Sequence, residues 1–205
     1  MSGIVGGYGT KSGHVDGPQG SMKLIDTRRG INSGSINWNL PEDYDSYELH
    51  FTAYGTSNGG KTRLKLSNNG GTGFLNEMST GMFYNGSSGT TFAHLYTTGG
   101  ANYGDNLYHM ISDGVEAGDH GGSQGQVGMS GWIKLINTKG DSIHASEAKT
   151  MYISSFCAYA HSANASYGTY GHSYMPITSG RINYIRYDHQ NGTIKGVFKL
   201  YGIKQ

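Results

Sequence analysis

Cysteine, charge and long apolar runs are all scarce in this chain of 205 residues. The one cysteine, Cys157, cannot form an internal disulfide, and within the run MYISSFCAYA it is expected to be a small buried hydrophobic residue. Charged residues are 14% of the chain, against roughly 25% in an average globular domain. The net charge is +1 and no long block of either sign occurs, which argues against a nucleic-acid partner.

Segments that would insert into or cross a membrane are missing as well. No run of 18 apolar residues occurs, so membrane insertion is not expected. No signal peptide is recognisable, so we expect a chain made in the cytoplasm of its host cell.

Sequence motifs for cofactor binding are either absent or lack the flanking secondary structure that they need. The stretch GTSNGGKT (55–62) matches a phosphate-binding loop, but that loop must open a helix, and here the next residues alternate as a strand. We therefore predict a hairpin loop that binds no nucleotide. The nine histidines show no metal-ligand spacing, although three of them meeting on a trimer axis would suit a metal. The sequence predicts no bound cofactor and no metal site.

Acidic residues offer only a weak case for an enzyme. Asp43, Asp45 and Glu48 in PEDYDSYE (41–48) lack the loop glycine and closing glutamate of an EF-hand, and a turn before a strand is the expected role. No Gly-x-Ser-x-Gly elbow occurs. A glycosidase with carboxylates distant in sequence stays open as a third alternative, but we predict a protein that is not an enzyme.

Short alternating segments fill most of the chain after residue 21. Turn sequences rich in Gly, Asn and Ser separate them, and no stretch of ten residues has helical periodicity. This spacing predicts an all-β, antiparallel two-sheet sandwich, jelly-roll-like, over residues 22–205. The expected strands lie near 22–29, 34–40, 47–54, 62–67, 89–97, 106–112, 127–137, 149–160, 181–188 and 193–203.

Residues 1–21 are glycine-rich and have too few apolar groups to build a core. We interpret them as an extended attachment arm that becomes ordered only against other chains, the alternative being a flexible tail. The side chains expected to anchor this arm are Ile4, Val5, Tyr8, Lys11, His14 and Val15.

Aromatic residues gather in the segment 152–174, where histidines lie between them. Exposed aromatic rings can stack on sugars or anchor a protein interface, whereas in an ordinary sandwich half of them would face the core. Glycine and serine separate the tyrosines of ASYGTYGHSYM (165–175), so we expect an exposed loop. Its possible ligand-binding residues are Tyr167, Tyr170, His172 and Tyr174.

The ending GRINYIRYDHQNGTIKGVFKLYGIKQ (180–205) resembles the C-terminal strands of many tailed-bacteriophage structural proteins. INWNLPEDYDSYELHFTAYG (36–55), LKLSNNGGTGF (64–74) and GMSGWIKLIN (128–137) resemble further strands of this group in the expected order, and KSGHVDG (11–17) resembles its short glycine-rich segments. The family comprises head-decoration and short tail-fibre proteins with a jelly-roll-like sandwich.

This resemblance implies a non-enzymatic virion protein. The expected role is capsid decoration (cement) or a short fibre, attached to other virion proteins through the N-terminal arm and assembled as a homotrimer. The alternative is a tail-fibre receptor-binding module that holds a host surface glycan through the tyrosine-rich segment. No shaft or coiled-coil region occurs, which favours a small protein docked directly on the particle.

Overall fold

The computed structural model describes residues 21–55, 60–75, 79–86, 93–97, 109–115, 128–140, 150–162, 165–176, 180–189 and 192–204. Every regular element in these ranges is a β-strand, and every strand pair is antiparallel. The predicted all-β sandwich is therefore confirmed. No helix that could span a membrane is found among the described residues.

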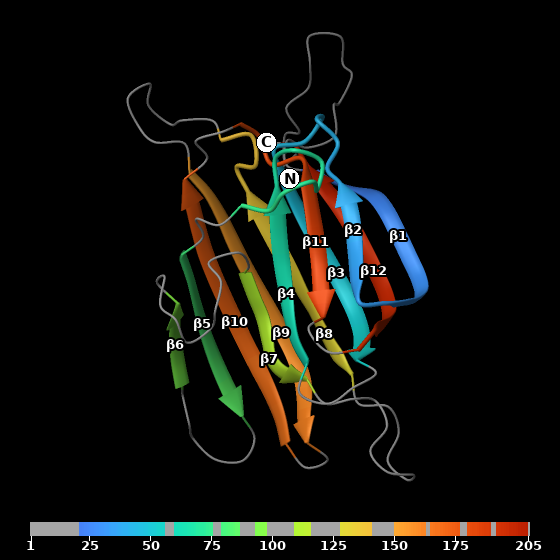
Figure 1. Ribbon diagram of the computed structural model, residues 1–205, viewed down its shortest axis with the longest axis vertical. Coiled ribbons are helices and arrows are strands. Elements are labelled where there is room, and N and C mark those ends of the chain that lie inside the picture. Colours follow the sequence, from blue (N-terminus) through green and yellow to red (C-terminus); the bar gives the residue numbers. More distant parts are fainter. Residues whose placement is uncertain are drawn as a thin grey trace, which may run out of the picture.

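The strands form two sheets, and the smaller one lies in front of the larger one in Figure 1. The eight-stranded sheet has the order β1 (Met22–Ser33), β12 (Ile194–Ile203), β3 (Ser46–Gly55), β8 (Met129–Ile136), β9 (Thr150–Ser162), β10 (Ala165–Pro176), β5 (Ser79–Gly86) and β6 (Ala93–Thr97). The four-stranded sheet has the order β2 (Ser35–Asn39), β11 (Tyr184–His189), β4 (Gly60–Ser67) and β7 (His109–Val115).

Eight of these strands have the connectivity of a jelly roll. These strands are, along the chain, β1, β2, β3, β4, β7, β8, β11 and β12. In the larger sheet the neighbours are β1, β12, β3 and β8, which are the first, eighth, third and sixth of the eight. In the smaller sheet they are β2, β11, β4 and β7, which are the second, seventh, fourth and fifth. Successive strands thus change sheet at every step except from the fourth to the fifth, β4 to β7, which pair with each other, and this is the pattern of nested Greek keys.

The other four strands extend the larger sheet beyond β8. The β5–β6 hairpin is inserted between β4 and β7, and the β9–β10 hairpin between β8 and β11. Because β10 also pairs with β5, the two insertions form one continuous addition, which we call the extension. In Figure 1 its outer strands, β5 and β6, project past the smaller sheet.

The core lies between the sheets and is built from alternate residues of each strand. On β3, the inward side chains of Leu49, Phe51 and Ala53 are buried, while Thr52 is exposed. Aromatic rings connect the two sheets: Phe198 lies 6.2 Å from Trp38 and 5.2 Å from Tyr187, measured between ring centroids. Burial of these large apolar surfaces is the main stabilising term of the jelly roll.

The turn that leads into β3 is fixed by an arginine from the far end of the chain. The Arg181 guanidinium donates to the carbonyl oxygens of Pro41, Glu42 and Tyr44 and to the Tyr47 hydroxyl. Burial raises the pKa of Tyr47, and the charge of Arg181 opposes that rise. The acidic run at 41–48 is thus a turn followed by a strand, as predicted.

Two predictions about local structure were wrong. Residues 55–62 are not a hairpin loop, because β3 and β4 belong to different sheets and are not paired with each other. The strand predicted after Lys61 is confirmed as β4. The segment 165–175 is not a loop but part of β10, which pairs with β9 and β5.

Candidate binding surface

The face of the eight-stranded sheet that points away from the smaller sheet is not covered by any other described element. We call it the open face. Its side chains are those that alternate with the core residues. On β10, Thr169 points inward, where its hydroxyl donates to the carbonyl oxygen of Ile111 on β7. Tyr170 therefore lies on the open face.

Large apolar side chains are exposed on this face. Tyr170, Tyr152 and Tyr174 have 58%, 54% and 51% of their surface exposed, and Ile136 has 39%. Cross-strand register brings Ile136, Tyr152 and Tyr174 into one row across β8, β9 and β10. Tyr170 packs on Phe156, with ring centroids 5.0 Å apart. Clustered exposed aromatics of this kind are typical of interaction sites.

Three of the four residues predicted to bind a ligand lie together on the open face. Tyr170, His172 and Tyr174 alternate along β10 and are exposed. Tyr167 belongs to the same strand, but its side chain lies outside the described part of the molecule. The predicted exposure is right for these three side chains and wrong for Thr169, Ser173 and Met175, which are buried, and the strand conformation was not expected.

A charged cluster lies beside these aromatics. Glu48 Oε1 is 2.7 Å from His50 Nε2, and Glu48 Oε2 is 3.4 Å from Lys134 Nζ. Lys134 Nζ also lies 5.2 Å from the ring centroid of Trp132, a cation–π contact. The His50 ring meets the Tyr201 ring edge-on at 5.2 Å.

Two adjacent rows of the open face differ sharply in side-chain size. Direct cross-strand partners share a face of the sheet, so each row crosses five strands from β12 to β10. The row of large residues, which we call the ridge, consists of Lys199, His50, Trp132, Phe156 and Tyr170. The row of small residues, which we call the trough, consists of Val197, Thr52, Ser130, Ala158 and Gly168.

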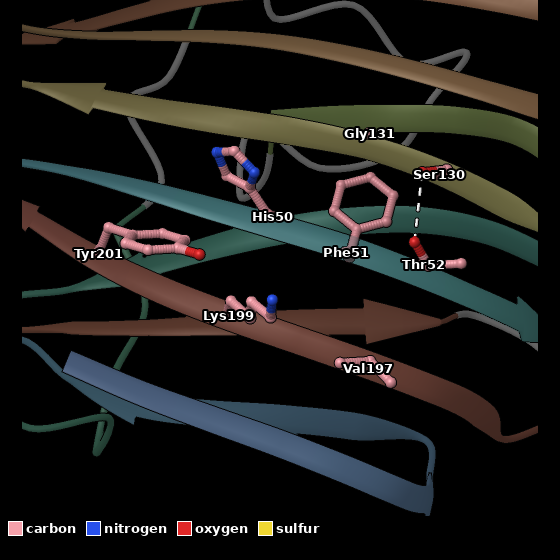
Figure 2. Close-up of a pocket in the computed structure, with 8 residues that line it drawn as sticks. All are labelled: His50, Phe51, Thr52, Ser130, Gly131, Val197, Lys199 and Tyr201. Atoms are coloured by element: carbon pink, nitrogen blue, oxygen red, sulfur yellow. Dashed lines mark hydrogen bonds between the residues drawn. The ribbon is translucent and has the colours of Figure 1, made fainter. Parts of the chain in front are cut away.

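The β12–β3–β8 end of the trough is a shallow cavity of about 370 Å³. Val197, Thr52 and Ser130 line it, together with His50, Lys199 and Tyr201 of the neighbouring rows and the backbone around Phe51 and Gly131. In Figure 2 these side chains come from three adjacent strands, and the contact between Thr52 Oγ1 and Ser130 Oγ, at 3.3 Å, spans β3 and β8.

The polar side chains that line the cavity form two separate sets. The Thr52 and Ser130 hydroxyls contact each other, and His50 contacts Glu48. No group of three His, Cys, Asp or Glu side chains within the described ranges is placed to hold a metal ion. The open face instead offers aromatic rings, hydroxyls and cations to a ligand.

The most strongly perturbed ionisable groups lie in the core, away from the open face. Burial raises the pKa of the Cys157 thiol to about 12, which confirms the expected buried cysteine and keeps it protonated. Burial likewise raises the pKa of Tyr187 well above its usual range. These shifts have structural causes and do not mark a reactive site.

The predicted anchors of the arm lie outside the described residues. They are Ile4, Val5, Tyr8, Lys11, His14 and Val15.

Sequence reasoning missed the trough because its members lie on five different strands of the sheet. A signal was present in β10 itself, where aromatic and small residues alternate from Tyr170 to Tyr174. The chain matches no protein-family model, no curated protein and no solved structure in the comparisons made.

Proposed function

We propose that the protein is a non-enzymatic surface component of a tailed-bacteriophage virion, a capsid decoration or short fibre protein that assembles as a homotrimer. The jelly roll is a frequent architecture of viral capsid proteins and lectins, but a fold alone does not specify a function. The observation that carries the proposal is the open face, where Tyr152, Tyr170 and Tyr174 are more than half exposed on one sheet surface. The family resemblance of the C-terminal strands supplies the virion context.

Attachment is assigned to the N-terminal arm. Strand β1 begins at Met22, opposite Ile203 of β12, so removal of residues 1–20 leaves every described strand intact. The truncated protein should keep the unfolding temperature of the full chain, because the core residues all lie beyond the deletion. It should fail to attach to virus particles assembled without the protein, whereas the full chain should attach.

The test is to measure occupancy of both proteins on such particles by cryo-electron microscopy. Full occupancy by the truncated protein would contradict attachment through the arm. Absence of the full-length protein from purified virions would contradict the virion proposal itself. Light scattering of the purified protein measures whether it is a homotrimer.

The alternative function, receptor binding through a host surface glycan, is favoured by the place of Tyr170 beside the trough. A Tyr170→Ser, Tyr174→Ser variant separates the two roles, since both side chains are exposed and distant from the core. A receptor-binding protein carrying these changes would attach to the particle normally, but the particle would adsorb less well to host cells. Unchanged adsorption would leave decoration as the function.

A further inference from the structure

We propose that the trough binds an extended saccharide chain that carries carboxylate groups, with an acidic sugar at the Val197 end. This inference deepens the receptor-binding alternative and depends on the proposed function only for its biological setting. It concerns a site defined by strand register rather than by the tyrosines of β10 alone.

The shape of the trough fits a linear ligand. Its five residues span five adjacent strands, which corresponds to a length of about 19 Å at the usual strand spacing. Along this length the ridge forms one continuous wall, with Trp132, Phe156 and Tyr170 in sequence across the sheet. A ligand in the trough would contact aromatic rings along one side and small residues beneath.

The chemistry of the trough fits sugar rings. Thr52 and Ser130 are exposed, and each hydroxyl can both donate and accept a hydrogen bond, as sugar hydroxyls do. Aromatic rings such as Trp132 present broad apolar faces on which the apolar side of a sugar can pack. Apolar walls with a few well-placed polar groups are the usual composition of a ligand site.

Cations gather at one end of the trough. Arg29 is the direct cross-strand partner of Val197, and Lys195 and Lys199 flank Val197 on β12, each about 7 Å away along the strand. Among the described side chains of the open face the sole carboxylate is Glu48, which is already paired with His50 and Lys134. The positive charge of this end thus lacks a balancing carboxylate within the described part of the face, and an acidic sugar would supply one.

Two other polymers fit less well. A nucleic acid is held mainly by cations along its phosphates, and the trough offers cations at its Val197 end alone. A sugar chain can instead use the hydroxyls of Thr52 and Ser130 in the neutral part of the trough. A peptide that adds a strand needs an unpaired sheet edge, whereas the trough runs across strands β12, β3, β8, β9 and β10, all paired on both sides. The charge distribution therefore favours an acidic saccharide.

The test is a titration of the protein with polygalacturonic acid and with polysialic acid. Tryptophan fluorescence and calorimetry measure the binding. The same polymers with reduced carboxyl groups, and single-stranded DNA, serve as comparison probes. We expect saturable binding of an acidic polymer, at least tenfold tighter than of its reduced form and of DNA. Trp132 fluorescence should change on binding, because this side chain lies in the ridge.

Three variants locate the site. Ser130→Leu should fill the trough and weaken binding at least tenfold, and Lys195→Gln combined with Lys199→Gln should remove the preference for the acidic over the reduced polymer. Lys204→Gln removes an exposed cation beyond the end of β12 and should leave binding unchanged. Circular dichroism establishes that each variant is folded.

Absence of binding to both acidic polymers, or equal affinity for DNA, would overturn the saccharide proposal. Binding unaffected by Ser130→Leu and by the double lysine variant would overturn the trough as its site. None of these outcomes alters the virion proposal, which is judged separately by occupancy on particles.

Discussion

The aromatic rings that fill the jelly-roll core and those on residues 168–176 of β10 lie on opposite faces of the larger sheet. The division is not complete, because Tyr159 of β9 is buried in the core and Trp132 of β8 lies on the open face. In the jelly roll, Phe51, Phe198 and Tyr187 meet inside, with ring centroids 5.2 to 6.4 Å apart. From residue 169 to residue 175 of β10 the inward positions hold small or flexible residues, while Tyr170, His172 and Tyr174 point outward. The inward set is Thr169, Gly171, Ser173 and Met175.

This difference separates the aromatic residues that stabilise the core from the exposed ones that we propose for binding. Each fully buried large apolar side chain contributes about 1.5–3 kcal/mol of transfer free energy, and the outward tyrosines of β9 and β10 forgo much of that gain because about half of their surface stays in water. Exposed aromatic clusters of this kind are typical of interaction sites, as the proposed binding role requires. The jelly roll is thus the stabilising half, and the extension provides much of the open face.

The largest predicted effect is on the aromatic core of the jelly roll. Phe198→Ala should lower the free energy of unfolding by about 3–5 kcal/mol, because Phe198 is fully buried among three aromatic rings. Lys199→Ala, one residue further on the opposite face, should change it by less than about 0.5 kcal/mol. Chemical denaturation of both variants measures these changes. Similar losses of stability for the two variants would contradict the difference between the inner and outer faces of β12.

The second largest loss of stability is expected where the jelly roll meets the extension, between β8 and β9. A Cβ at Gly131 of β8 would lie 2.0 Å from the Phe156 carbonyl oxygen and 2.9 Å from Phe51 Cζ. Gly131→Ala should therefore force β8 and β9 apart and cost about 1–3 kcal/mol. Gly168→Ala is the matched control, since its Cβ would meet nothing closer than 3.8 Å. Equal stability of both variants, measured by denaturation, would show that close approach at Gly131 is not required.

Within the extension, the polar inner face predicts a smaller effect. Thr169 Oγ1 lies 2.7 Å from the Ile111 carbonyl oxygen of β7 and 3.1 Å from that of Cys157. Thr169→Val keeps the shape but removes the donor, and should cost about 1–2 kcal/mol. Thr52→Val, at an exposed hydroxyl, should be nearly neutral under the same denaturation assay. A neutral Thr169→Val would mean that this bond between the sheets adds nothing to stability.

Sequence reasoning succeeded where the apolar residues of a strand face the core. The strands at 47–54, 62–67 and 193–203 were predicted from their alternation, and burial of Leu49, Leu64 and Phe198 explains it. It failed at β10, where the alternation is inverted and glycine and serine suggest a loop. It also failed at 55–62, because a local pattern does not show which sheet the next strand will join.

The candidate site could be predicted only in part. Exposure of Tyr170 and Tyr174 followed from their sequence neighbours, and the structure confirms it. The trough could not be predicted, because it depends on the register that sets Val197 beside Thr52 and Thr52 beside Ser130. Such alignment is a property of the folded sheet and leaves no mark in any single segment.

The smallest predicted effect is a pH dependence confined to the jelly roll. His189 of β11 is 3% exposed, and its Nδ1 lies 3.3 Å from the Thr62 hydroxyl. Burial lowers the pKa of His189, the Arg63 charge lowers it further, and Asp188 opposes both. In the folded state the ring is therefore neutral at a pH where the unfolded chain, with a pKa of about 6.5, already binds a proton.

Because the unfolded state binds more protons in that window, stability should rise with pH through it. The His189 contribution is fully present above about pH 7.5 and is lost as the pH falls below about 6.5 toward the lowered folded pKa. His189→Gln cannot titrate, so its free energy of unfolding should decline less steeply between pH 8 and pH 5. Chemical denaturation at intervals across this range measures both slopes. Equal slopes for the two proteins would mean that His189 is protonated in the folded jelly roll as readily as in the unfolded chain.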